Sequence, residues 1–332
     1  MKLAVCVVNW FGAEDTRGCL SSLAKYCKDA EVFLLENGSG QGDLMMEMAD
    51  SRTKVFLSDE NTGFAAGCNL LMKEALSNGA DVVLLMNNDA EATEGFADEP
   101  LGLLSEPGVG FIESLILTAD GLKVDTAGHR HLSSGDVIPE GRGLPAGSVS
   151  ANSDILSGCA ASLFLKSEML KEIGFFEEDF FLGYEDVDLT YRASTMGWRG
   201  VMCASSVVKH RLNASIDRVR GPAYYTRSQR NALLSYLYNT PAAVVAANLP
   251  WVLLKYAAVT LSALLFGRPW VVGVYWKALF EVMRQGRGVA RVRRERLKKR
   301  KLGSLDLWLR QKNPVPSYLK LFGGALRAPP LK

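Results

Sequence analysis

Three carboxylates within four positions, Glu185, Asp186 and Asp188, form the segment of the sequence best suited to acid–base chemistry. They follow the aromatic and small residues 180–184, and residues 189–192 continue after them at helical spacing. A carboxylate in a largely apolar setting has a raised proton affinity, which makes it useful as a general base near neutral pH. A helix N-terminus at this junction would also favour negative charge. The alternative is that Asp186 or Asp188 only caps the helix.

The first half of the chain must position such a site, and it alternates between expected strands and helices. We expect strands at residues 2–8, 31–35, 54–57 and 81–86, and helices at residues 14–26, 44–49 and 64–77. This alternation predicts an α/β fold with a mainly parallel sheet flanked by helices. Ligands bind such sheets beyond the carboxyl ends of the strands. The polar residues that collect there, which are also common turn residues, are Asn9, Glu36, Asn37, Asp59, Asn61, Asn87, Asn88 and Asp89.

Two other motifs are weaker. The glycines at 38–42 follow a strand, but their spacing is G-x-G-x-G instead of the G-x-G-x-x-G of dinucleotide-binding loops. His129 and His131 could form a metal pair, but no third ligand lies nearby in the sequence, and we expect surface histidines. The sequence contains no convincing Ser/His/Asp or Cys/His arrangement for nucleophilic catalysis.

Composition limits the class of protein. The chain has 332 residues, of which 48% are hydrophobic, and its six cysteines form no C-x-x-C pair. With no apolar run of signal-peptide length at its start, these features predict a cytoplasmic protein with reduced thiols. Residues 1–283 carry 23 Lys and Arg against 34 Asp and Glu, whereas residues 284–332 carry 15 against 2. The basic tail therefore predicts an anionic partner surface, and we expect a membrane instead of nucleic acid.

The sequence before this tail supports the membrane. Residues 242–267 are long enough to span a bilayer, but Pro250 interrupts them and Lys255 lies near their centre, where a charge costs about 2.5–3.5 kcal/mol. An amphipathic helix and the basic run at 284–301 follow. This order predicts peripheral association with an anionic membrane through residues 242–301. An ordinary helical subdomain with a solvated basic tail, or a true spanning helix, remain alternatives.

Five motifs in sequence resemble the family 2 glycosyltransferases, and within them the bacterial rhamnosyltransferase-like enzymes that build cell-surface polysaccharide. They are V-V-N-W at 7–10, L-L-E-N-G-S at 34–39, N-T-G-F-A-A-G-C-N at 61–69, L-M-N-N-D at 85–89, and G-F-F-E-E-D-F-F at 174–181 followed by E-D-V-D-L at 185–189. The resemblance covers roughly residues 1–235. It implies a GT-A fold, a nucleotide-sugar donor, Mg²⁺ or Mn²⁺, and inversion at the anomeric carbon.

The resemblance also assigns residues. Asp89 takes the place of the D-x-D metal motif, whose first carboxylate is Asn87 here, and His210 is expected as the second metal ligand. Asp186 would be the general base. Its acceptor-binding or supporting neighbours would be Glu185, Asp188 and Tyr184. The residues expected to bind the nucleotide-sugar are Asn9, Glu36, Asn37, Asn61, Gly63, Phe64, Asn69, Asn88 and Asp89. Glu36, which would accept the base N3–H, is one methylene longer than the family's usual aspartate.

These inferences combine into one expected organisation. The catalytic domain covers 1–235, with a nucleotide-sugar half at 1–115 and an acceptor half at 116–235, followed by helices with the basic run at 236–302 and a tail at 303–332. The expected enzyme is a metal-assisted inverting hexosyltransferase of cell wall polysaccharide biosynthesis, held at the inner face of the plasma membrane. Its donor would be dTDP-L-rhamnose or a UDP-sugar and its acceptor a lipid-linked or cell-surface glycan. No nucleic acid partner is expected, and a homo-oligomer is compatible with the sequence.

Two other functions stay open at this point. One is a non-catalytic protein that binds nucleotide-sugars, which Asn87 and Glu36 support slightly. The other is a nucleotidyltransferase, which shares the sheet architecture. The chain lacks the glycine-rich, basic phosphate loop near the N-terminus that a nucleotidyltransferase would need.

Overall fold

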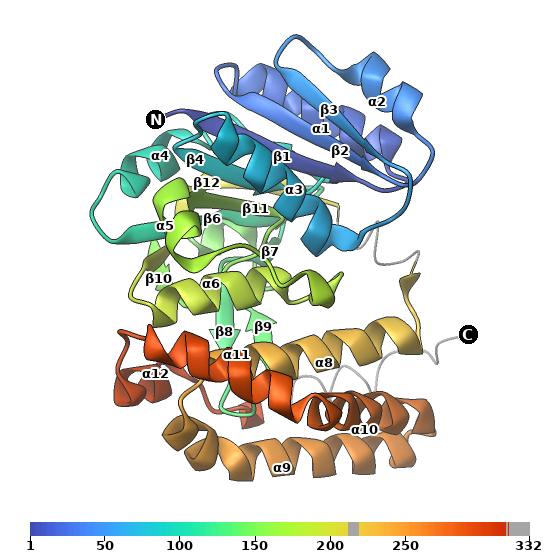
Figure 1. Cartoon of the computed structure of the whole chain (residues 1–332), viewed down its shortest axis with the longest axis vertical. Coiled ribbons are helices and arrows are strands. Elements are labelled where there is room, and N and C mark those ends of the chain that lie inside the picture. Colours follow the sequence, from blue (N-terminus) through green and yellow to red (C-terminus); the bar gives the residue numbers. More distant parts are fainter. Residues whose placement is uncertain (212–218, 317, 319–332) are drawn as a thin grey trace.

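The computed structural model describes residues 1–211, 219–316 and 318. A large sheet with helices on both faces forms one part of the molecule, and the C-terminal helices form a layer beneath it (Figure 1). Residues 212–218 of the expected catalytic domain and residues 317 and 319–332 of the expected tail lie outside the described residues.

The expected alternation of strands and helices is confirmed. The strands are β1 (Leu3–Asn9), β2 (Glu31–Asn37), β3 (Thr53–Ser58) and β4 (Val82–Met86). The helices between them are α1 (Ala13–Tyr26), α2 (Gly42–Met48) and α3 (Gly63–Ser77). Every residue of β1 is buried, as a parallel strand covered on both faces requires. Ala4, Cys6 and Val8 face the core on the α3 side of the sheet, and the alternate residues of β1 face the core on the α1 side.

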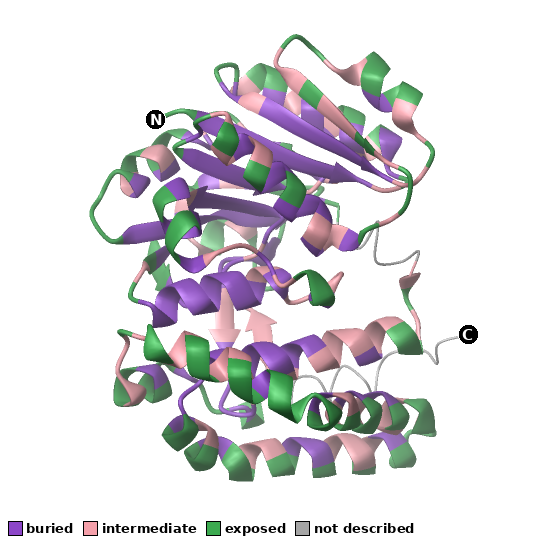
Figure 2. Cartoon of the chain, viewed as in Figure 1, coloured by how far each residue is buried: buried purple, intermediate pink, exposed green. Residues whose placement is uncertain are grey.

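The second half of the chain extends this sheet with strands of both directions. The elements are β5 (Ala90–Ala92), α4 (Asp98–Leu104), β6 (Val109–Thr118), β7 (Val124–Thr126), η1 (Ala146–Ser148), β10 (Ser153–Ile155), β11 (Ser162–Lys166), α5 (Ser167–Ile173), η2 (Glu178–Phe180), α6 (Glu185–Thr195) and β12 (Arg199–His210). The strand order is β10-β12-β6-β11-β4-β1-β2-β3, and β11 runs antiparallel between β4 and β6. Figure 2 shows the central strands of this sheet, among them β6 and β11, buried between the flanking helices.

Strand β12 contains a bulge that affects the site. It pairs in parallel with β6 through Cys203 and Ser114, and pairing resumes at Val207 and Leu115, so that residues 204–206 are extra. Ser206 in the bulge is buried, and its hydroxyl lies 2.8 Å from that of Ser114. The strand then continues to its last residue, which pairs with β5.

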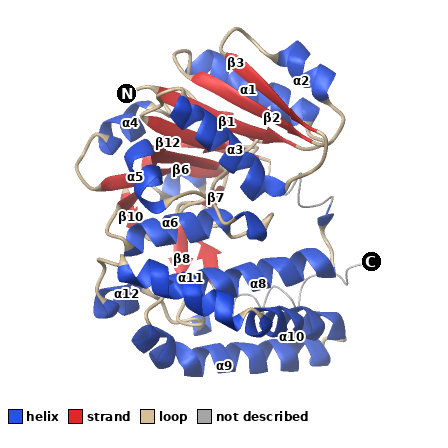
Figure 3. Ribbon diagram, viewed as in Figure 1, coloured by secondary structure: helices blue, strands red, loops and turns tan. Residues whose placement is uncertain are grey.

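The helices after β12 that the structure describes form the C-terminal layer (Figure 3). They are α8 (Pro222–Asn239), α9 (Ala242–Leu265), α10 (Pro269–Arg284), α11 (Gly286–Lys298) and α12 (Ser304–Arg310). Helix α8 contacts α6, α10 and α11, and therefore connects the layer to the sheet part. Within the described ranges, α9 is the single helix long and apolar enough to cross a membrane, judged by length and composition, and 22% of its most apolar window is buried.

A small hairpin reaches from the sheet part toward the C-terminal helices (Figure 1). It consists of β8 (His129–His131) and β9 (Val137–Pro139), which pair antiparallel. At its turn, Asp136 forms an ion pair with Lys255 of α9, whose side chain is 3% exposed. The charge that the sequence placed at the centre of an apolar helix is therefore neutralised inside the protein.

Candidate active site

Asp89 and His210, the two expected metal ligands, lie next to each other beyond the end of the sheet. Asp89 precedes β5, and His210 ends β12, which pairs with β5. His210 Nε2 is 3.1 Å from Asp89 Oδ1, and the amide nitrogen of Asn87 is 3.4 Å from the same ring nitrogen. The sheet therefore joins two residues that are 121 positions apart in the sequence.

A second carboxylate, Asp125 of β7, holds the other side of the His210 ring. Its Oδ2 accepts a hydrogen bond from Nδ1 at 3.0 Å, and its Oδ1 pairs with Arg142 at 2.7 Å. Burial lowers the pKa of His210, but the hydrogen bonds to Asp125 and Asp89 outweigh burial and raise this pKa to about 9. A carboxylate behind a histidine fixes the ring and directs its other nitrogen, here Nε2, toward a ligand.

These donor atoms fit one side of a divalent-cation site. A carboxylate oxygen from Asp89 suits Mg²⁺ or Mn²⁺, and His210 Nε2 lies beside it. Among the described residues, no three His, Cys, Asp or Glu side chains gather as a complete metal cage. Cations of this kind keep several positions for water and phosphate oxygens, so two protein ligands suffice where a diphosphate supplies others.

The acidic segment begins α6, as the sequence predicted. Tyr184 precedes the helix with a φ of 71°, and Phe181 has a φ of 60°; both are left-handed conformations that cost a non-glycine residue about 1–3 kcal/mol. Asn231 of α8 holds this turn, because its side-chain amide donates to the carbonyls of Phe180 and Gly183 at 2.9 and 2.8 Å. The C-terminal layer therefore fixes the strained turn that presents the acids.

The two adjacent acids differ in access. Glu185 is buried, and burial together with the charge of Asp186 raises the pKa of Glu185 to about 8. Asp186 is half-buried, and its Oδ2 accepts a hydrogen bond from the backbone N–H of Ala160 at 2.9 Å. Of the pair, Asp186 is the carboxylate that a ligand can reach.

Glu113 of β6 stabilises the loop that contacts Asp186. This wholly buried carboxylate accepts hydrogen bonds from the backbone N–H groups of Gly128 and Cys159, each at 2.7 Å. Burial nevertheless raises the pKa of Glu113 to about 8. Glu113 thereby connects the start of the hairpin with the loop that carries Ala160.

The hairpin histidines lie under α6, and the expectation of surface histidines is wrong for His131. This residue is buried, its ring lies 4.4 Å from that of Tyr191, and Nε2 is 2.7 Å from the Ser157 hydroxyl. Burial, with a smaller effect from His129, lowers the pKa of His131 to about 3. His129 is half-buried, and burial lowers its pKa although the charges of Asp186 and then Asp125 act in the opposite direction.

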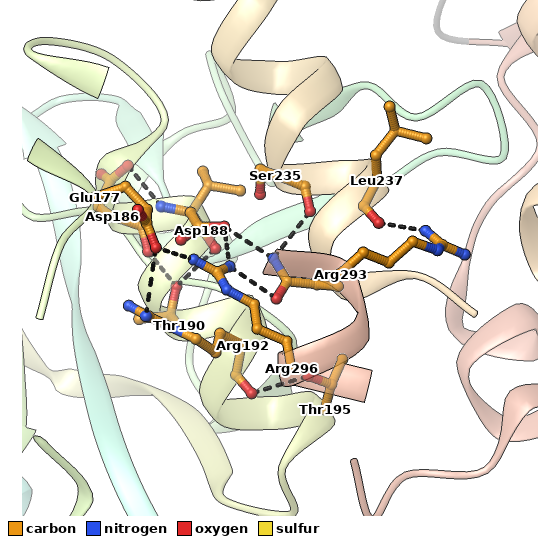
Figure 4. A network of polar contacts seen from close by, with 12 residues as sticks. Glu177, Asp186, Asp188, Thr190, Arg192, Thr195, Ser235, Leu237, Arg293 and Arg296 are labelled. Carbon is orange, nitrogen blue, oxygen red and sulfur yellow. Dashed lines mark hydrogen bonds and ion pairs between the residues drawn. The ribbon is translucent and has the colours of Figure 1, made fainter. Parts of the chain in front are cut away.

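Asp188, the third acid, points into the protein (Figure 4). It is 0% exposed, and its Oδ1 accepts hydrogen bonds from Arg296 of α11 at 2.7 Å and from the amide of Asn239 at 2.9 Å. Arg296 also pairs with Glu177. Asp188 therefore anchors α6 to the C-terminal layer.

Two of the residues expected at the nucleotide-sugar form a buried amide cluster. The Oδ1 of Asn9 accepts hydrogen bonds from the backbone of Gly12 at 3.1 Å and from the hydroxyl of Thr16 at 3.0 Å. The amide of Asn88 donates to the same Oδ1 at 3.3 Å. These contacts join the ends of β1 and β4 to the start of α1, so the side chains shape the edge of the sheet.

The last two residues of β2, Glu36 and Asn37, brace a second loop. Asn37 accepts hydrogen bonds from the backbone and hydroxyl of Thr62 at 3.1 and 2.9 Å, and its amide lies 3.3 Å from the Oδ1 of Asn61. Glu36 is buried and accepts the backbone N–H of Ser39 at 2.7 Å. The 61–63 loop is therefore fixed against the end of β2.

This loop touches the strained turn before α6. Gly63 has a φ of 87°, and a Cβ built on it would lie 2.5 Å from the Phe181 ring. Below it, Asn69 exchanges hydrogen bonds with the backbone of Phe176 at 2.9 and 3.0 Å, and Phe64 stacks on the Phe176 ring. The structure thereby connects the expected nucleotide-sugar loop directly to the segment that carries Asp186.

Comparisons with known proteins bear on this arrangement. No family model matches the chain. A 199-residue stretch is 27% identical to the O-antigen biosynthesis protein RfbC of Myxococcus xanthus, and the match covers 56% of this chain and 15% of that protein. A 226-residue stretch is 21% identical to the low-salt glycan biosynthesis hexosyltransferase Agl10 of Haloferax volcanii, covering 67% of this chain and 71% of that protein.

Solved structures give the fold. GalNAc-T7 with UDP, GalNAc and Mn²⁺ superposes with a TM-score of 0.58 at 13% identity, over 72% of this chain and 48% of that one. The mannosyltransferase PcManGT from Pyrobaculum calidifontis in complex with GDP-Man and Mn²⁺ superposes with a TM-score of 0.53 at 15% identity, over 97% and 84%. The chain has the GT-A fold.

Three residues that support the site in this GT-A chain were not predicted from the sequence. Glu113 lies inside an apolar strand, and an acid at a buried position of such a run is a signal for a polar network. Arg296 lies seven positions after Val289 on a helix, so that the two share one face, which indicates that this arginine points inward. Asp125 stands in a glycine-rich region, where no pattern in the sequence distinguishes it from a turn residue.

Proposed function

We propose that this protein transfers a sugar from a nucleotide-diphosphate donor to a glycan acceptor. The observation that carries the proposal is the Asp89–His210 pair at the end of a GT-A sheet. The backbone hydrogen bond from Ala65 to the carbonyl of Phe181, at 3.2 Å, joins the loop expected at the donor to the strained turn before Asp186. The named functions of RfbC, Agl10 and PcManGT support a role in glycan assembly.

Asp89 and His210 would hold a divalent cation, with Asp125 orienting the His210 ring. When bound, such a cation neutralises charge that develops on a departing diphosphate. The expected donor pocket would be formed by Glu36 and the braced loop around Gly63, whose lack of a side chain leaves room for Phe181. In our proposal, Asn9 and Asn88 keep the floor of this pocket in place through their mutual hydrogen bond.

Asp186 would act as the general base on the acceptor hydroxyl. The backbone N–H of Ala160 holds one of its oxygens in place, and its partial exposure leaves the carboxylate accessible. A single displacement assisted by one base inverts the anomeric configuration and needs no enzymic nucleophile. We therefore propose an inverting transferase. For the donor we propose dTDP-L-rhamnose, with UDP-sugars as the next candidates, on the motif resemblance.

We further propose that the C-terminal layer rests on an anionic membrane, with the catalytic part on the cytoplasmic side. Large apolar side chains are exposed on α9 and α10, including Leu265, Phe280 and Met283 at 71%, 60% and 69% exposure. Helix α11 adds basic residues that are also exposed, Arg287, Arg291, Arg294 and Lys298. Apolar and basic surfaces side by side are typical of proteins bound to the membrane interface.

The test is a donor screen followed by a transfer assay. Thermal shifts with Mn²⁺ would compare dTDP-, UDP- and GDP-sugars, and the best donor would then be used with a lipid extract as the acceptor source. We expect Asp186→Asn to retain donor binding and to lower transfer by about 10²–10⁴-fold. Asp179→Asn, an exposed acid seven positions earlier, is the matched control and should transfer normally. Unchanged transfer by the Asp186 variant would disprove the assignment.

A further inference from the structure

A cavity that is open to the surface on one side lies against the C-terminal layer, and the reaction above does not use it. It lies between the hairpin β8–β9 and the helices α9 and α10, and its volume is about 350 Å³. A cavity of roughly 150 Å³ already binds benzene, so this one can hold a longer hydrocarbon chain. Its apolar walls include Val137, Ile138, Val259, Ala263, Phe266 and Val271.

The basic side chains Lys255 and Arg268 both line this cavity, and they differ in whether they form an ion pair. Lys255 is paired with Asp136, and its ammonium group also lies 5.7 Å from the centre of the Tyr275 ring. Arg268, at the start of α10, lines the same cavity and forms no ion pair with any described residue. The wall therefore presents one guanidinium that is available to an anion beside a large apolar volume.

The position of the cavity connects two surfaces. Phe266 and its neighbours Leu264 and Leu265 are exposed at the end of α9, on the face proposed above to meet the membrane. The same cavity is also lined by Tyr184, whose hydroxyl is 3.5 Å from the carbonyl of Val137. Tyr184 is two residues before the expected base, so the cavity extends from the apolar face to the acidic turn.

We propose that this cavity binds the hydrocarbon chain of a phosphorylated lipid acceptor, with Arg268 contacting the phosphate. The inference rests on the proposed function and specifies its acceptor class. Charge complementarity selects this occupant, because an apolar volume whose wall carries a guanidinium with no ion-pair partner among the described residues matches an amphipathic anion.

The experiment measures equilibrium binding of farnesyl monophosphate to the full-length protein, with farnesol and inorganic phosphate as separate arms. We expect farnesyl monophosphate to bind, farnesol to bind more weakly, and inorganic phosphate not to bind. Val259→Trp fills the cavity and should weaken farnesyl monophosphate binding at least tenfold. Ala257→Trp, on an exposed position of the same helix, is the matched control and should change binding less than twofold.

Arg268→Gln tests the phosphate contact. It should lower affinity for farnesyl monophosphate about tenfold and leave the affinity for farnesol unchanged. Val271→Trp fills the cavity from the opposite wall, and it replaces Val259→Trp if circular dichroism shows that the latter is misfolded. Equal binding by the filled and control variants would overturn the proposal. So would competition by inorganic phosphate, or a change of oligomeric mass on filling, which would mark the cavity as an interface between copies.

A measurement of donor binding distinguishes failure of the acceptor inference from failure of the proposed function. Thermal shift with nucleotide-sugar and Mn²⁺ should be unaffected by Val259→Trp, because the cavity lies away from Asp89 and His210. If no nucleotide-sugar binds the wild type, the proposed function fails while the lipid measurements still stand. If donors bind and farnesyl monophosphate does not, only the acceptor inference fails.

Discussion

Replacing Arg296 with methionine tests the link between the basic helix and the acidic segment. The guanidinium is 9% exposed and lies 2.7 Å from the Oδ1 of Asp188, which is 0% exposed (Figure 4). Methionine retains the apolar stem but leaves Asp188 as a buried charge with the Asn239 amide as its remaining side-chain hydrogen-bond partner among the described residues. Removing one member of a buried ion pair costs about 3–5 kcal/mol, and we expect a loss of that size.

The assay is equilibrium denaturation by urea at pH 7, followed by tryptophan fluorescence. Arg294→Met is the matched control, since Arg294 is exposed on the same helix and should change the free energy of unfolding by less than about 0.5 kcal/mol. The double variant with Asp188→Asn should be less destabilised than the sum of the single variants, because their effects share one interaction. Additive effects, or an Arg296 variant as stable as its control, would refute the reasoning.

The same pair predicts a pH dependence. Burial raises the pKa of Asp188, but the charges of Arg296 and then Arg192 outweigh burial, and the net pKa lies below the usual value. A carboxylate with a lowered pKa contributes stability above its unfolded pKa, and this contribution is lost as the pH falls. The wild type should therefore lose stability in acid more steeply than the Arg296→Met variant, which unfolding midpoints between pH 3 and pH 7 would measure.

Three further changes test other parts of the site. Glu113 has its pKa raised to about 8 by burial, so its contribution to stability is present below the unfolded pKa of about 4.5 and is lost as the pH rises toward 8. Glu113→Gln should therefore lose less stability between pH 5 and pH 8.5 than the wild type in chemical denaturation. Gly63→Ala should destabilise the fold by about 1–3 kcal/mol, because Gly63 has a positive φ and an added Cβ would collide with Phe181. The same variant should bind the donor more weakly, which calorimetry would measure. Asp125→Asn should lower Mn²⁺ affinity in the presence of nucleotide about 10–100-fold, since Asp125 orients His210.

Each of these has an outcome that would contradict it. A Glu113 variant with the same pH slope as the wild type would show that the carboxylate is ionised throughout. A Gly63 variant of normal stability and donor affinity would show that the two loops separate readily. Unchanged Mn²⁺ affinity in the Asp125 variant, with calorimetry as the readout, would remove His210 from the proposed metal site.

The sequence predicted the parallel half of the fold because each strand there is a continuous apolar run between clear helices. The family motifs predicted that Asp89 and His210 belong to one site. Their contact depends on the pairing of β5 with β12, which no local sequence pattern reveals. Tertiary packing explains two places where the structure differs from what the sequence indicated. His131 of the hairpin is buried under α6 and does not lie at the surface. The basic run contains exposed residues as well as the inward-facing Arg296, because the number of charges in a run does not indicate which face of the helix each one occupies.

The extra residues 204–206 of β12 set the direction in which His210 points. Side chains alternate between the two faces of a strand, so removing one residue from this bulge would rotate the strand end by half a turn and move the imidazole to the opposite face. Length variation that surface loops absorb easily would here separate His210 from Asp89. In homologous chains that retain the histidine, the spacing between Ser114-like and His210-like positions should therefore be constant, which gives alignments of distant relatives a structural anchor.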